Sequence, residues 1–155
     1  MANVEKSIEV NVPVHSAYNQ WTQFETFPQF MEGVEEVRQE DDTRLHWTAK
    51  VMGKKEEWNA KITEQVPDRK IAWQSTSGAP NAGEVTFQPL SDTTTRVNLR
   101  LEAEPRTVGE KVGDAIGVLD RQVKTDLDKF KHFIESRGGQ PTGEWRGEVK
   151  RGEPS

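Results

Sequence analysis

Apolar residues near the start of the chain follow first the period of a strand and then the period of a helix. Every second position of residues 4–12 is apolar, apart from Lys6, and this alternation predicts a strand with one buried face. Pro13 suits the first turn of a helix, and residues 14–21 place apolar side chains three or four positions apart. Phenylalanines then surround Pro28, which predicts a second short helix or an ordered turn that packs on the core.

The middle of the chain has the period of strands. From residue 34 to about residue 104, apolar residues recur at every second position and turn residues interrupt them. The pattern predicts about six strands, or seven with the first one. Met52 and Gly53 suit a two-residue hairpin turn. Counting back along both arms of that hairpin places Trp47 directly opposite Trp58 on the apolar face.

After Pro105 the period changes to that of a helix. Apolar residues at this spacing predict a helix of about 30 residues that ends before Gly138 and Gly139. Such a helix is about 45 Å long and can cross most of a sheet. Together the elements predict an α+β fold. A curved seven-stranded antiparallel sheet wraps around the long C-terminal helix, and two short helices follow the first strand.

Composition divides the chain into a body and a tail. Residues 1–137 carry nearly all the apolar side chains, whereas residues 138–155 contain only Trp145 and Val149 as apolar residues. A segment of this kind buries too little apolar surface to fold alone. We therefore expect one domain followed by a polar, disordered tail. Deletion from residue 140 onward is expected to change the free energy of unfolding by less than about 0.5 kcal/mol.

Charge and composition argue against several functions. The chain carries a net charge of −5 and contains no cysteine, so it lacks both the basic stripe of a nucleic-acid-binding protein and the thiolates of many metal sites. His15, His46 and His132 show no metal-ligand spacing. No run of residues resembles a signal peptide or a membrane span. We expect no metal, no cofactor, no catalytic residue, no nucleic-acid partner, no integral membrane association and a cytoplasmic location.

Several short motifs resemble one superfamily over about residues 3–137. They are Val12-Pro13, the segments 27–34 and 66–73, and the segments 83–87 and 126–131. These motifs resemble the polyketide cyclase/dehydrase and START-related superfamily, also called Bet v 1-like or SRPBCC, near its coenzyme-Q-binding START-domain branch. The resemblance implies the helix-grip fold. It leaves the function open, because the superfamily includes lipid-transfer proteins, aromatases and chaperone activators.

The fold and the resemblance favour a protein that binds a small hydrophobic or amphipathic ligand, such as a polyketide, quinone or lipid. We expect a cavity between the sheet and the long helix. Its expected lining is Phe27, Phe30, Trp47, Trp58, Trp73, Phe87, Val112, Ile116 and Leu119. The expected oligomeric state is a monomer or a weak homodimer.

Two alternatives remain open at the level of sequence. The resemblance allows a polyketide cyclase/dehydrase of the aromatase type, which would be a lyase. The many large side chains equally allow a stress-related or protein-interaction module whose cavity is filled by its own residues. Gly109, Gly113 and Gly117 fit either close packing of the long helix or room for a ligand.

Overall fold

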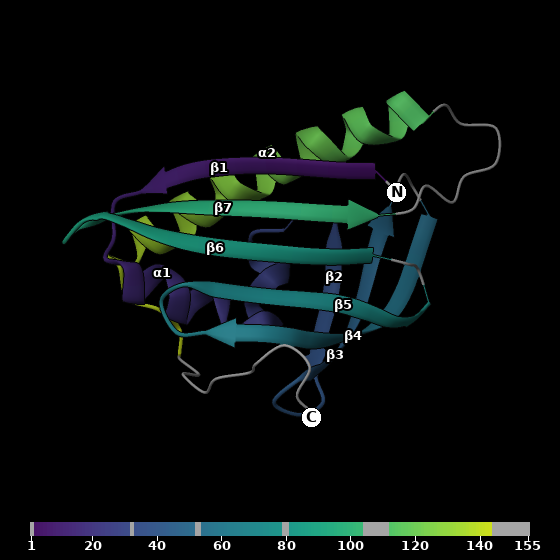
Figure 1. The fold of residues 1–155 in the computed structure, drawn as a ribbon, viewed down its shortest axis with the longest axis horizontal. Coiled ribbons are helices and arrows are strands. Elements are labelled where there is room, and N and C mark those ends of the chain that lie inside the picture. Colours follow the sequence, from purple (N-terminus) through teal and green to yellow (C-terminus); the bar gives the residue numbers. More distant parts are fainter. Residues whose placement is uncertain (1, 32, 52–53, 79–80, 104–111, 144–155) are drawn as a thin grey trace.

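A computed structural model of the chain describes residues 2–31, 33–51, 54–78, 81–103 and 112–143. Seven strands form one curved antiparallel sheet in the order β1-β7-β6-β5-β4-β3-β2 (Figure 1). The strands are β1 (Ala2–Val10), β2 (Val34–Gln39), β3 (Arg44–Val51), β4 (Lys54–Val66), β5 (Lys70–Gly78), β6 (Asn81–Ser91) and β7 (Thr94–Ala103). Strands β2 to β7 pair in chain order, and β1 joins the far edge beside β7.

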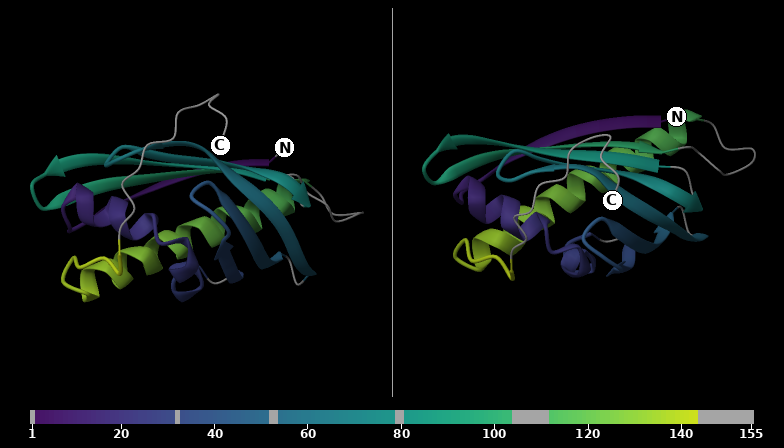
Figure 2. Two further views of the ribbon diagram at one scale, coloured as in Figure 1. Left: turned by 90° about the horizontal axis from the view of Figure 1, so that it is seen from below. Right: turned by 60° about the horizontal axis from the view of Figure 1, so that its bottom comes forward.

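The helices lie together on one side of this sheet (Figure 2). They are α1 (Val14–Trp21), the 3-10 helix η1 (Phe24–Gln29) and α2 (Val112–Ser136). Pro28 lies inside η1, and an α-helix is disfavoured there because proline lacks an N–H group and crowds the preceding turn. Gly138 and Gly139 follow α2 with φ angles of +67° and +79°, a left-handed backbone that ends helices. The expected helix-grip architecture is confirmed.

The register of the central hairpin is the one that the sequence predicts. Trp47 pairs with Trp58 in the β3–β4 ladder. Their ring centroids are 5.9 Å apart and their planes differ by 9°, so the two indoles stack. Cross-strand aromatic pairs of this kind stabilise a sheet by up to about 1 kcal/mol.

Charged contacts join α2 to β1. Lys6, the polar residue in the inner row of β1, places its Nζ 3.1 Å from Asp120 Oδ1 on α2. Further along, Lys131 Nζ donates a hydrogen bond of 3.0 Å to the backbone oxygen of Glu9. Lys6 therefore interrupts the apolar row because it meets the helix there. Lys131 also occupies a backbone group of an edge strand, which lowers the tendency of that edge to pair with another chain.

The chain after α2 folds back onto α1. The side chain of Gln20 is fully buried. Its Oε1 accepts a hydrogen bond of 2.8 Å from the backbone N–H of Thr142, and its Nε2 lies 3.1 Å from the hydroxyls of both Thr142 and Thr26. Residues 138–143 of the expected tail are thus attached to the body. Residues 144–155 lie outside the described part, and the division into domain and tail stays a prediction.

Candidate ligand-binding site

The inner face of the sheet has two halves with different side chains. The first, here called the packed half, lies against α1, η1 and the part of α2 that follows Asp120. Trp21 is at its centre, with its ring centroid 4.8 Å from that of Phe130 and 5.5 Å from that of Phe27. Its other large, nearly completely buried members are Tyr18, Phe24, Phe30, Ile71, Val85, Phe87, Val97, Leu127 and Ile134. Interlocking rings at this density serve the stability of the fold.

The second half, here called the turn half, is the inner face near the turns that follow Val51 and Gly78. Its strand positions carry the inward tryptophans among small or polar residues, namely Ala49, Glu56, Ala60, Ser75 and Gly83. The first turns of α2 run toward this end of the sheet (Figure 1). The packed half therefore carries large side chains on both layers, whereas the strands of the turn half contribute few large groups besides tryptophan.

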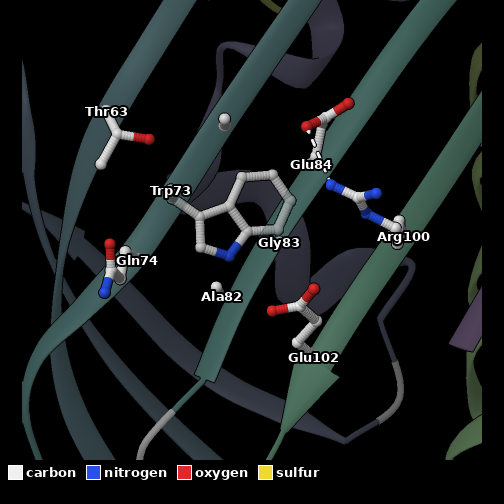
Figure 3. A pocket seen from close by; sticks show the side chains of 9 residues that line it. Thr63, Trp73, Gln74, Ala82, Gly83, Glu84, Arg100 and Glu102 are labelled. Carbon is white, nitrogen blue, oxygen red and sulfur yellow. Dashed lines mark hydrogen bonds and ion pairs between the residues drawn. The ribbon is translucent and has the colours of Figure 1, made fainter. Parts of the chain in front are cut away.

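Trp73 lies across the neighbouring strand at Gly83 (Figure 3). A Cβ atom at position 83 would stand 2.3 Å from Cζ2 and 2.4 Å from Cε2 of the Trp73 ring. Those separations are far below van der Waals contact, which is about 3.5–4.0 Å between carbon atoms. Glycine therefore allows the indole to lie close to the strand backbone, and a larger residue would push the ring toward α2.

Three tryptophans of the interior bury their indole nitrogens. Within the described residues, no hydrogen-bond partner reaches the Nε1 atoms of Trp21, Trp47 and Trp58, although all three nitrogens are buried. The Trp21 indole is enclosed by aromatic rings, whose faces can accept a weak hydrogen bond. Because the Trp47 and Trp58 rings are stacked nearly parallel, their in-plane N–H groups cannot point at each other's faces.

The outer face of the sheet carries a shallow depression of about 170 Å³. It is bordered by Thr63, Ala72, Trp73, Gln74, Ala82, Gly83, Glu84, Arg100 and Glu102 (Figure 3). Glu84 is 3.3 Å from an Arg100 nitrogen and 3.5 Å from Lys70 Nζ, so its charge is compensated within the protein. The depression is smaller than the roughly 300–1,000 Å³ of typical small-molecule sites. The inner face is the stronger candidate.

The expected lining residues separate between the two halves. Phe27, Phe30 and Phe87 belong to the packed half, and Trp47, Trp58 and Trp73 belong to the turn half. Trp47 is the contact between the halves, with its ring centroid 5.7 Å from that of Phe27. Their role in ligand binding stays a prediction.

Part of the expected site falls where the structure describes no side chains. Val112, Ile116 and Leu119 lie on the first turns of α2, where the description covers the backbone alone. Gly113 and Gly117 share those turns, and Gly109 lies outside the described residues. These glycines could serve close packing of the helix or leave room for a ligand, and both explanations therefore stay open.

Sequence reasoning did not identify Gly83 as the residue that lies against the Trp73 ring. Periodicity placed Trp73 on the inner face, but the residue beneath its ring is set by the pairing of β5 with β6. A glycine inside an apolar alternation is a signal for a close approach. That signal was available in the sequence, although it does not say what approaches.

The histidines do not meet in the described structure. His46 lies on the outer face, with Nδ1 2.8 Å from Asn59 Oδ1 and Nε2 3.4 Å from Glu57 Oε1. His15 lies in the first turn of α1, and His132 is exposed on α2. Among the described residues, no group of three or more His, Cys, Asp and Glu side chains could hold a metal ion. No helix in that part is both long and apolar enough to cross a membrane.

The curved seven-stranded sheet with its long C-terminal helix defines the chain as a protein of the helix-grip class. The model of the family described as "Polyketide cyclase / dehydrase and lipid transport" matches residues 10–131. The chain belongs to this family, and the resemblance of its motifs to the polyketide cyclase/dehydrase and START-related superfamily is confirmed. The nearness to the coenzyme-Q-binding branch stays a prediction.

The chain is also similar to a protein from another organism in sequence and to solved structures in fold. An uncharacterized 17.2 kDa protein of Streptomyces lincolnensis is 57% identical over 150 residues, which are 96% of this chain and 99% of that protein. The aromatase/cyclase ZhuI of a Streptomyces species has a similar fold with a TM-score of 0.72, at 18% identity over 88% of this chain and 94% of its own. A START superfamily protein of Mycobacterium smegmatis has a TM-score of 0.66, at 15% identity over 87% of this chain and 95% of its own.

Proposed function

We propose that the protein binds a small hydrophobic or amphipathic molecule between the turn half of the sheet and the first turns of α2. The observation that carries this proposal is the change of side-chain size along the inner face. Rings fill the packed half, whereas Ala60 pairs with Ser75 and Trp73 pairs with Gly83 in the turn half. Small residues beside flat aromatic rings make a surface suited to an apolar guest.

The family supports the same class of function. Its description names lipid transport beside cyclase and dehydrase activity, and both kinds of protein need an apolar interior that admits a molecule. The cyclase/dehydrase alternative needs, in addition, a proton-transferring group beside the substrate. Glu56, in the inner row of β4, is the carboxylate of the turn half that such an enzyme could use. Binding is the function common to both alternatives, and the cytoplasmic location and weak self-association remain predictions.

Titration with a neutral apolar fluorescent probe, N-phenyl-1-naphthylamine, tests the proposal. Ser75 is on the inner face of β5, and Gln74 is its neighbour on the outer face, at the edge of the depression. We expect one probe molecule per chain for the unmodified protein. Ser75→Leu should weaken binding at least tenfold, and the matched Gln74→Leu variant should bind normally, with both melting temperatures recorded to confirm folding.

The opposite pattern would place the probe in the outer depression. No binding to the unmodified protein would contradict the proposed function and favour the interaction module with a filled interior. Native mass spectrometry of freshly purified protein adds an independent test. A mass above that of the denatured chain would reveal a co-purified ligand and give its size.

A further inference from the structure

Two buried indole N–H groups in the turn half point to the chemistry of the ligand. We propose that Trp47 and Trp58 donate hydrogen bonds to an oxygen acceptor, a carbonyl or an ether, on the bound molecule. This inference rests on the proposed function and names the class of ligand: an apolar ring system that carries at least one acceptor oxygen. A plain hydrocarbon of the same shape should bind less well.

The argument begins with the cost of an unpaired donor. A buried N–H group without an acceptor destabilises a protein, and buried indole N–H groups usually find a partner. Trp47 is 5% exposed. Trp58 is half-buried, but its Nε1 atom is buried like that of Trp47. Two such donors on directly paired residues are therefore better explained by a guest acceptor than by packing alone.

The geometry of the pair supports a shared acceptor region. Trp47 and Trp58 are opposed across the β3–β4 ladder and their rings stack with a 9° difference in plane. Parallel rings present their N–H groups at the ring edges, away from each other's faces. Trp58 carries the stronger case, because among the described residues its only aromatic neighbour is the parallel Trp47. Trp47 and Trp21 each also meet the Phe27 ring, at 57° and 63°, where a ring face can accept a weak hydrogen bond.

Fluorene and fluorenone make a suitable pair of probes, since they share one ring system and only fluorenone carries a carbonyl oxygen. Equilibrium dialysis measures both dissociation constants without relying on tryptophan fluorescence. We expect the preference for fluorenone over fluorene to fall about tenfold in Trp47→Phe and in Trp58→Phe, the loss typical of one hydrogen bond. Fluorene affinity should change little, because phenylalanine keeps an aromatic ring at each position.

Trp21→Phe is the matched control, because it removes the same kind of donor from the packed half. The preference for fluorenone should be unchanged in this variant. An equal preference in all four proteins would overturn the inference and leave the proposed function standing. Failure of the unmodified protein to bind either compound would overturn both.

Indole resonances in an ¹H–¹⁵N correlation spectrum of the unmodified protein give a second test that does not depend on a variant folding. Fluorenone should shift the Nε1–H signals of Trp47 and Trp58 downfield, and fluorene should not. The Trp21 signal should stay in place with both compounds. Equal shifts with the two compounds would also overturn the inference.

Discussion

The packed half and the turn half of the inner face share strands of one sheet, yet they differ in the size of the side chains that they carry. In the packed half, residues from α1, η1 and α2 meet the sheet with rings and branched aliphatic groups. Trp21, for example, lies against Phe27, Phe30, Phe87 and Phe130. In the turn half, the strand positions shrink to Ala60, Ser75 and Gly83. A protein that binds a guest needs both, because one region must hold the fold together while the other gives up packing energy that its ligand can restore.

Leucine-to-alanine substitutions should show the largest difference between the halves. Leu127 on α2 is 2% exposed in the packed half, whereas Leu101 on β7 is half-buried beside Gly83. Leu127→Ala should lower the free energy of unfolding by about 2–5 kcal/mol, since removal of a buried side chain leaves a cavity. Leu101→Ala should cost less than half as much. Urea unfolding of both variants gives the values, and equal losses would contradict the comparison.

Replacement of Gly83 by alanine should strain the turn half. The new Cβ would meet the Trp73 ring at 2.3 Å, so overpacking should cost about 1–3 kcal/mol. The control is the double variant Gly83→Ala with Trp73→Leu. Once the indole is absent the methyl group fits, and a double-mutant cycle should recover most of that cost. A Gly83→Ala protein as stable as the unmodified one would show that the ring moves away freely.

Two truncated chains test where the part of the chain that stabilises the fold ends. A chain that ends at Pro141 loses Thr142 and leaves the buried amide of Gln20 without two of its hydrogen-bond partners. This should cost about 1–2 kcal/mol. A chain that ends at Gly143 keeps both contacts and should change by less than about 0.5 kcal/mol. The first value is larger than the effect expected from composition for deletion from residue 140, because composition does not register the contacts of Thr142 with Gln20. Thermal unfolding compares the two, and equal melting temperatures would contradict the role of Thr142.

The smallest expected effect concerns stability in acid and depends on Glu135, near the end of α2. Burial by itself raises the pKa of Glu135, but hydrogen bonds of 2.6 Å from Lys131 Nζ and 2.7 Å from the Asn11 backbone N–H bring it below its ordinary value of 4.5. A carboxyl with a lowered pKa in the folded state stabilises the protein above its unfolded pKa, and this contribution disappears as the pH falls through the folded pKa.

Glu135→Gln should therefore be less stable than the unmodified protein at neutral pH by under about 1 kcal/mol, because the group is partly exposed. The difference should shrink as the pH falls below the ordinary pKa of 4.5 and disappear once the carboxyl is protonated in the folded state as well. Urea unfolding at several pH values measures it. A difference that stays constant with pH would show that the carboxylate charge contributes nothing.

The pattern of apolar and polar positions was sufficient to predict the helices and strands and the register of the hairpin of β3 and β4. A period of two or of 3.6 positions reports which side of one element is buried, and the register of Trp47 with Trp58 follows from a turn only two residues long. The same reasoning identified an inward Trp73 and a polar Lys6 in an apolar row. It could not say what either side chain meets.

Those partners come from contacts between residues far apart in the chain. Lys6 finds Asp120, and Gln20 finds Thr142, because α2 lies along β1 and the following segment returns to α1. The composition of residues 138–155 predicted a tail free of the body, since an average over many residues conceals one threonine that satisfies a buried amide. Periodicity carries no information about such pairs, because it describes one element at a time.

The sequence by itself determined the seven strands, the three helices, their order and the aromatic character of the interior, because burial of apolar side chains acts on each element through its own period. The tertiary structure alone decided where in the interior the large and the small side chains lie. Curvature of the sheet and the path of α2 bring the rings together at one end and place small residues beside Trp58 and Trp73 at the other. Apolar side chains thus form a dense core at one end and leave small groups beside the tryptophans at the other, according to which residues the fold brings face to face.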